Sequence, residues 1–314
     1  MGKFWQGKKV LVTGANGFIG SWLCKALVEE GADVCGMIYS ENNLFKEQGI
    51  QGRVKTVRAD LGLMEEIEMA FSEATPEICF HLAAKSTAAQ VEEDKEAALN
   101  VNVEGTRMVL EVAEKHKSAV VFVSSVKVYG SFTKKCFDEE DELTGEGLYA
   151  ESKIKAEFEC ARAAVKGLSV GIARLGNVYG GFDPNYSRIV PSSVRRMLAK
   201  APASIKGKGK NSQDFVYVED VAQGLLAIGK KALAEKLGAE AFNLGSGKSI
   251  SVKELVEKVG EAGKREIMPN FFGEEKACRE LLCIEKAKKE LGWKPSFSLE
   301  DGLKKTIELY RDKI

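Results

Sequence analysis

The feature that most constrains the fold is an apolar run that ends in a glycine-rich turn, Val10-Leu11-Val12-Thr13-Gly14-Ala15-Asn16-Gly17-Phe18-Ile19-Gly20. The apolar run indicates a strand, and the amphipathic segment after it indicates a helix. Gly14 allows backbone angles that a side chain forbids, Gly17 lets the main chain approach a pyrophosphate, and Gly20 lets the helix lie close to the strand. Because the helix N-terminus then offers free N–H groups to an anion, this unit predicts a dinucleotide-binding site.

The chain beyond this turn alternates strands with helices. Strands are expected at 33–38, 54–57, 78–82, 119–124 and 169–175, and helices at 18–30, 64–74, 92–117 and 149–165. This alternation is typical of an α/β fold, a doubly wound parallel sheet of Rossmann-like type. After Gly176 the regularity weakens, although returning strands are expected at 215–218 and 241–244. We therefore expect a dinucleotide-binding domain at 1–175, with a returning segment at 214–245, and a smaller C-terminal substrate lobe at 176–213 and 246–314.

Composition narrows the function classes. The 314 residues carry 46 Lys and Arg against 46 Asp and Glu, so no net field favours nucleic acid or an anionic membrane surface. The apolar runs are too short to span a bilayer and the N-terminus lacks a signal-peptide stretch, which predicts a cytoplasmic protein. Seven cysteines without a C-x-x-C pair predict free thiols in a reducing compartment. With two histidines in the chain, no histidine-based metal site is expected.

Candidate chemistry lies in the later helices and strands of the sheet. Tyr149 and Lys153 are one helical turn apart, so they share a face of the predicted helix. A cation beside a phenol lowers the phenol's pKa, which would make Tyr149 a general base near neutral pH. Ser124 and Ser125 end the strand at 119–124, on the edge where doubly wound sheets bind ligands. A serine there can hydrogen-bond a substrate hydroxyl or its developing oxyanion.

The residues after the second strand bear on the choice of cofactor. In doubly wound folds an acidic residue there binds the ribose hydroxyls of NAD, whereas a basic one accommodates the extra phosphate of NADP. The segment Tyr39-Ser40-Glu41-Asn42-Asn43 has no Arg or Lys before Lys46. The sequence therefore favours NAD and leaves NADP as the alternative.

Taken together, these motifs resemble those of a known family. The segments that carry the resemblance are Thr13-Gly14-Ala15-Asn16-Gly17-Phe18-Ile19-Gly20, His81-Leu82-Ala83-Ala84, Asn102-Val103-Glu104-Gly105-Thr106, Ser124-Ser125-Val126-Lys127-Val128-Tyr129-Gly130, Tyr149-x-x-x-Lys153, Arg174-Leu175-Gly176-Asn177-Val178-Tyr179-Gly180, Asp214-Phe215-Val216-Tyr217-Val218-Glu219-Asp220 and Leu291-Gly292-Trp293-Lys294-Pro295. In order along nearly the whole chain, they are similar to the extended short-chain dehydrogenase/reductase family, the nucleotide-sugar epimerases and dehydratases of carbohydrate metabolism.

The resemblance implies a role for individual residues. The implied cofactor-binding residues are Gly14, Asn16, Gly17, Phe18 and Ile19 at the pyrophosphate, Asp60 and Leu61 at the adenine, Leu82, Ala83 and Ala84 at the ribose edge, and Tyr149 and Lys153. The implied catalytic set is Ser125, which matches the family's Ser/Thr better than Ser124, with Tyr149 and Lys153. The implied substrate-binding residues are Ser125, Lys127, Asn177, Arg188, Gln213 and Arg279. Gln213 stands where the family usually has Arg, so the nucleotide is left open. The family also implies a homodimer that pairs through helices at about 92–117 and 149–165.

The same resemblance implies the reaction. Tyr149 as phenolate takes the proton of a sugar hydroxyl at C4 while hydride passes to the nicotinamide, and Lys153 holds the ribose. An epimerase then returns hydride to the other face of the ketone. In most family members a 4,6-dehydratase needs adjacent acids after the catalytic Ser/Thr, where this chain has Val126 and Lys127. The leading prediction is therefore an NAD-dependent epimerase, an isomerase.

Three alternatives remain open. Lys127 and the segments 176–181 and 188–191 are similar to those of CDP-glucose 4,6-dehydratases, which carry Asp-Lys after the catalytic residue. An NADPH-dependent keto-sugar reductase is a further enzyme alternative. Outside the enzyme class, the chain could be a dinucleotide-binding regulatory protein.

Overall fold

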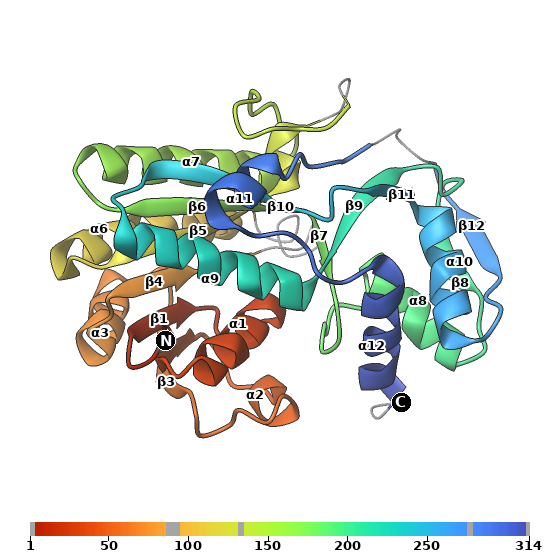
Figure 1. Cartoon of the computed structure of the whole chain (residues 1–314), viewed down its shortest axis with the longest axis horizontal. Coiled ribbons are helices and arrows are strands. Elements are labelled where there is room, and N and C mark those ends of the chain that lie inside the picture. Colours follow the sequence, from red (N-terminus) through yellow and green to blue (C-terminus); the bar gives the residue numbers. More distant parts are fainter. Residues whose placement is uncertain (1–3, 86–94, 131–134, 275–278, 312–314) are drawn as a thin grey trace.

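The computed structural model describes residues 4–85, 95–130, 135–274 and 279–311, and its centre is a seven-stranded parallel sheet (Figure 1). The strands are β1 (Lys9–Thr13), β2 (Asp33–Ile38), β3 (Lys55–Arg58), β4 (Ile78–His81), β5 (Ala119–Ser125), β6 (Val170–Leu175) and β10 (Gly238–Leu244). They lie in the order β10-β6-β5-β4-β1-β2-β3, and every neighbouring pair is parallel. The predicted doubly wound α/β fold is confirmed.

Helices cover both faces of this sheet. One face carries α1 (Phe18–Glu29) and α9 (Val218–Ala234), and the other carries α3 (Met64–Ala74), α6 (Gly105–His116) and α7 (Leu148–Val165). Because side chains alternate along a strand, Val10 and Val12 pack in one core and Leu11 in the other. Apolar residues at successive positions are what a strand buried on both faces requires.

The C-terminal part of the chain forms a second group of elements beside the sheet (Figure 1). Its strands are β7 (Asn177–Tyr179), β9 (Ser212–Tyr217) and β11 (Ser249–Ser251) in one sheet, and β8 (Ala203–Lys206) and β12 (Pro269–Phe272) in another. Its helices are α8 (Ile189–Leu198), α10 (Val252–Gly263) and α12 (Leu299–Arg311), whereas α11 (Glu285–Leu291) packs against α9 and β10 of the large sheet. A core of its own, which includes Val194, Val259 and Leu303, joins α8, α10 and α12. Of the two returning strands expected from the sequence, β10 joins the large sheet and β9 pairs with β7 and β11.

The helix expected at 92–117 is interrupted where the structure describes it. The chain forms α5 (Lys95–Leu99), a π-helical turn η1 (Asn100–Glu104) and then α6. Within η1 the Asn102 amide donates to the Lys85 carbonyl at 3.0 Å and to Ser152 Oγ at 3.0 Å, and its oxygen accepts from the Lys85 N–H at 2.8 Å. These bonds tie the loop after β4 to α7, so the turn serves the geometry of the sheet edge.

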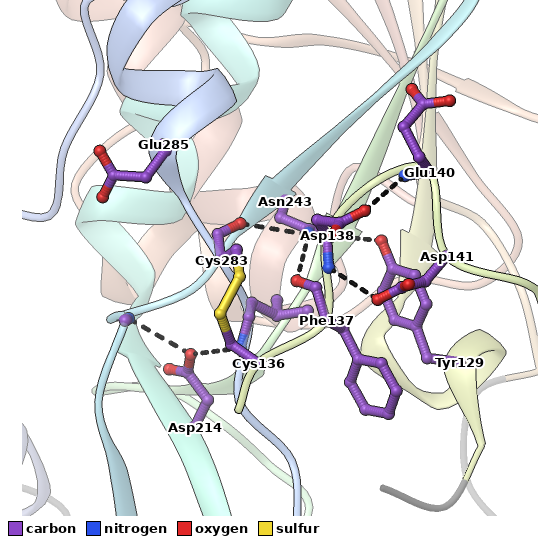
Figure 2. The surroundings of a disulfide bond; sticks show 12 residues. Tyr129, Cys136, Phe137, Asp138, Glu140, Asp141, Asp214, Asn243, Cys283 and Glu285 are labelled. Carbon is purple, nitrogen blue, oxygen red and sulfur yellow. Dashed lines mark hydrogen bonds between the residues drawn. A yellow bond between two sulfur atoms is a disulfide. The ribbon is translucent and has the colours of Figure 1, made fainter. Parts of the chain in front are cut away.

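The prediction of free thiols throughout is wrong for one pair of cysteines. Cys136 and Cys283 form a disulfide between the loop after β5 and the segment before α11 (Figure 2). Their Cα atoms are 5.4 Å apart although 147 positions separate them in the chain, so no local spacing signalled the bond. Cys24, Cys35, Cys79 and Cys160 are free and buried, as expected of small core residues, and Cys278 lies outside the described residues. Among helices that the structure describes, none has the length and apolar character to cross a membrane.

Candidate active site

A cavity of about 1080 Å³ opens at the carboxyl ends of β1, β4, β5 and β6, against β7 and α8. It brings together residues that the sequence scatters over more than 200 positions. The predicted site residues that line it are Gly14, Gly17, Phe18, Ile19, Leu82, Ala83, Ala84, Ser125, Lys127, Tyr149, Lys153, Asn177, Arg188 and Gln213. Asn16, Asp60, Leu61 and Arg279 are not part of the lining. Ligand placement at this edge is the general behaviour of open parallel sheets.

The glycine turn fits a dinucleotide. Gly14 has a φ of +65°, and a Cβ placed on it would lie 2.9 Å from Ala83 Cα, so only glycine keeps the rim of the cavity open there. A Cβ on Gly20 would overlap the Gly14 carbonyl oxygen, which explains how closely α1 packs against the turn. No side chain caps the N-terminus of α1 at Gly17. Its N–H groups and the helix dipole are therefore available to an anion such as a pyrophosphate.

Asn16 acts behind this turn. Its amide donates to the Ser40 carbonyl at 2.6 Å, and its own carbonyl accepts from the Asn42 amide at 2.8 Å. The first βα turn is thus fixed to the loop after β2, the loop that the sequence associates with the choice between NAD and NADP. That loop carries Glu41 and no basic residue, and the turn below it carries the open glycines, so the residues present fit NAD.

A buried triplet supports the end of β4. His81 lies between Thr13 and Thr106, with Nδ1 2.7 Å from Thr13 Oγ1 and Nε2 3.0 Å from Thr106 Oγ1. Thr13 Oγ1 also accepts from the N–H groups of Leu82 and Ala83, at 3.2 and 3.1 Å. Burial lowers the pKa of His81 to about 3, which keeps the ring neutral and makes it a positioning group for the cavity rim.

Tyr149, Ser125 and Lys153 meet at the floor of the cavity. Burial raises the pKa of Tyr149, while a hydrogen bond with Ser125 and the charge of Arg188 oppose that rise. The Lys153 ammonium donates to the Val123 carbonyl at 2.8 Å, and burial is the largest influence on the phenol's pKa. Burial lowers the pKa of Lys153 itself to about 8. The phenol is therefore protonated in the free protein near neutral pH, and it is poised to exchange its proton through Ser125.

Ser124 has a different task from Ser125. Its hydroxyl donates to Glu157 at 2.5 Å, inside a buried network in which Arg174 binds both oxygens of Glu157 at 2.7 and 3.2 Å. Arg174 also donates to the Tyr129 hydroxyl at 2.9 Å, and that hydroxyl donates to Asn243 at 2.8 Å. Ser124 thus belongs to the framework that joins β5, β6 and β10, whereas Ser125 is the serine that bonds Tyr149.

The opposite wall of the cavity is built from charged pairs. The Lys127 ammonium is paired with the Glu280 carboxylate, whose other oxygen accepts from the Asn177 amide at 2.8 Å. Arg188 is paired with Asp183 at 3.1 Å. Glu280 lines the cavity but was missed by sequence reasoning, because a lone glutamate carries no local signal.

Comparison with known proteins gives consistent findings. Residues 10–245 match the sequence model of the NAD dependent epimerase/dehydratase family. A UDP-N-acetyl-alpha-D-glucosaminuronate decarboxylase of Bacillus cytotoxicus is 28% identical, and the match covers 97% of this chain and 98% of that protein. The crystal structure of a UDP-glucose 4-epimerase of Thermotoga maritima with UDP-glucose is 29% identical, covers 97% and 99% of the two chains and superposes with a TM-score of 0.88. A dTDP-glucose 4,6-dehydratase of Bacillus anthracis in complex with NAD is 25% identical, with coverage of 98% and 97% and a TM-score of 0.86.

Proposed function

Because the chain belongs to the NAD-dependent epimerase/dehydratase family, we propose that it is a 4-epimerase of a nucleotide-diphosphate sugar that works through a transient 4-keto intermediate. The family makes the chain an NAD-dependent enzyme of nucleotide sugars. The single observation that supports epimerisation is the identity of the residue that follows Ser125. Val126 there is 2% exposed and is not part of the cavity lining, so no acid adjacent to Ser125 is available to eliminate a hydroxyl.

In the proposed reaction the Tyr149 phenol first loses its proton to solvent through Ser125, and the phenolate then accepts the proton of the sugar C4 hydroxyl. Ser125, hydrogen-bonded to Tyr149, holds the same oxygen and relays its proton. NAD, when bound, supplies the nicotinamide that takes up the hydride and returns it. Lys153 holds the cofactor ribose. Epimerisation requires that the ketone turn over before the hydride returns, and it uses no further acid or base.

The remaining binding residues are proposed from the resemblance to the family. We propose that Gly14, Asn16, Gly17, Phe18 and Ile19 serve the pyrophosphate. The other proposed cofactor contacts are Asp60 and Leu61 at the adenine and Leu82, Ala83 and Ala84 at the ribose. The proposed diphosphate and sugar contacts are Lys127, Asn177, Arg188, Gln213 and Arg279, in a substrate lobe formed by residues 176–213 and 246–314. The large-sheet part, residues 1–175 with 214–245, is the proposed dinucleotide-binding domain.

A second candidate function is 4,6-dehydration. It is favoured by the Lys127–Glu280 pair, because an ammonium and a carboxylate at the cavity wall could handle the protons of C5 and the C6 hydroxyl. The experiment that separates the two is incubation with UDP-, dTDP-, CDP- and GDP-glucose and NAD, followed by sugar analysis. Epimerisation predicts the inverted hexose, and dehydration predicts a 4-keto-6-deoxy sugar. Recovery of unchanged sugar from all four would contradict both candidates.

Two further proposals concern the oligomeric state of the protein and its location in the cell. A homodimer through α6 and α7 is supported by Phe158 and Val165, which are 63% and 91% exposed on α7 although both are apolar. Sedimentation as a monomer at micromolar concentration would contradict it. A cytoplasmic location is proposed because four cysteines of the described chain are buried free thiols, whereas the Cys136–Cys283 disulfide favours an oxidising compartment. Acid-quenched alkylation of cell extracts tests the location, because a disulfide at Cys136 in every molecule would place the protein in an oxidising compartment.

A further inference from the structure

Glu280 stands out among the polar groups at the cavity. It is 3% exposed, yet it lines the same cavity as Ser125 and Tyr149. One of its carboxylate oxygens pairs with the Lys127 ammonium, and the other accepts from the Asn177 amide at 2.8 Å. The backbone of Lys127 lies next to Ser125, because the Lys127 N–H donates to Ser125 Oγ at 3.3 Å. The charged pair is therefore a wall of the compartment in which the sugar reacts.

The backbone around Glu280 is fixed by hydrogen bonds and by the nearby disulfide. Its own N–H donates to the Ser212 carbonyl at 2.8 Å. Two residues later, the Leu282 N–H donates to Asp214 at 3.2 Å, and Cys283 is bonded to Cys136 (Figure 2). Asp214 is itself buried and also accepts from the Ser246 N–H at 2.7 Å. The backbone of this segment is therefore fixed, and a change of the Glu280 rotamer would break its carboxylate's bonds with Lys127 and Asn177.

Two other cations that line the cavity, Arg188 and Lys153, are also engaged. Arg188 is paired with Asp183, which is 2% exposed, and Lys153 donates to the Val123 carbonyl. A nucleotide diphosphate already brings two negative charges to this cavity. A sugar with a carboxylate at C5 would bring a third. Where the C5 substituent faces the wall of Lys127 and Glu280, a carboxylate would meet the fixed charge of Glu280, whereas a hydroxymethyl group could accept from Lys127 and donate to Glu280.

We propose that Glu280 is a specificity-determining residue, which neutralises Lys127 and makes the cavity select nucleotide-diphosphate hexoses over the corresponding hexuronates. This inference rests on the proposed function and narrows its substrate class. Removal of the carboxylate would expose the Lys127 ammonium, which then attracts the uronate. Removal of both charges would restore a neutral wall and cancel that gain.

The test compares UDP-glucose with UDP-glucuronate, which differ only at C6. We expect the wild type to prefer UDP-glucose by about tenfold or more in kcat/KM, because like charges in contact cost more than a kilocalorie or so per mole. Glu280→Gln, which keeps the shape and the Asn177 contact, is expected to shrink this preference about tenfold, through KM of the uronate. The double variant Glu280→Gln with Lys127→Gln is expected to restore most of the preference. Glu285→Gln, exposed and outside this cavity, is the matched control.

Each outcome separates the inference from the function on which it rests. Calorimetric binding of both UDP-sugars in the presence of NAD accompanies the kinetics, and thermal unfolding checks that each variant is folded. Turnover with an equal or reversed sugar preference in the wild type, or an unchanged preference in Glu280→Gln, would overturn the inference and leave the function standing. Absence of turnover with a binding preference that shifts as described would overturn the proposed reaction and support the inference.

Discussion

The two walls of the cavity are built in different ways. The cofactor side is formed by contiguous motifs at the ends of β1 and β4, where small residues and the buried pair of Thr13 and His81 fix the backbone without net charge. The substrate side is formed by ion pairs between distant segments, such as Lys127 with Glu280, 153 positions apart. The comparison teaches that the first side is set by local backbone geometry and the second by long-range charge pairing. The two sides should therefore respond differently to substitution.

The largest expected effect lies between the two walls, at Tyr149. Tyr149→Phe removes the hydroxyl that exchanges the substrate proton, so kcat should fall by about 10²- to 10⁴-fold. The unfolding free energy should stay equal or rise, because the hydroxyl is partly desolvated and burial raises its pKa. Single-turnover kinetics and chemical denaturation measure the two quantities. A variant with full turnover would remove Tyr149 from the mechanism.

Removal of the disulfide tests the substrate side of the cavity, which depends on contacts between distant segments. Cys136→Ala combined with Cys283→Ala should lower the unfolding free energy by about 2 to 4 kcal/mol, because the bond closes a loop of 147 residues in the unfolded chain. Since the bond fixes the segment of Glu280, KM for the nucleotide sugar should rise while the affinity for NAD stays constant. A reductant should bring the wild type to the level of the variant. An equal loss of NAD affinity would erase the distinction between the two walls.

The pH dependence of the unfolding free energy tests the burial of Lys153, on the cofactor side of the cavity. Burial lowers its pKa from 10.5 to about 8, so between these values the unfolded chain binds more protons than the folded one. Stability from this group therefore increases with pH, by about 2 kcal/mol between pH 7 and pH 9.5. Lys153→Met should flatten this rise and abolish turnover. Denaturation curves at several pH values give the slope, and an unchanged slope in the variant would show that another group produces it.

The smallest effect is expected at Gln213, on the substrate side. This residue lines the cavity at a position where members of the family usually carry arginine. Gln213→Arg should lower KM for the nucleotide sugar by about three- to tenfold, because a guanidinium gains charge-assisted bonds to phosphate. Steady-state kinetics measure it, with kcat as the internal control. A KM that rises would mean that the diphosphate does not reach this part of the wall.

The sequence could predict the large sheet because its strands are apolar runs between turn signals. The bounds of β2 and α3 were predicted to the residue. The strands β8 and β12 could not be found, because four residues carry no usable periodicity and each is defined by a partner more than 60 positions away.

The site divides in the same way. The glycines, Ser125, Tyr149 and Lys153 could be predicted because fixed local spacings place them at one sheet edge. Glu280 and the disulfide could not, since neither a lone glutamate nor two cysteines 147 positions apart carry a local signal. The direction of the Tyr149 pKa shift was predicted wrongly for the free protein, because the spacing of Tyr149 and Lys153 does not reveal the burial that raises this pKa.

The most direct test of the central claim follows the hydrogen at the reacting carbon. UDP-glucose deuterated at C4 would be incubated with the protein and NAD, and the product sugar analysed by NMR and mass spectrometry. The account predicts that the C4 epimer keeps its deuterium, that the wild type shows a primary isotope effect and that NAD is not consumed. Loss of the deuterium to solvent would contradict hydride transfer to a bound cofactor, and an epimer formed at the same rate by Tyr149→Phe would contradict the proposed base.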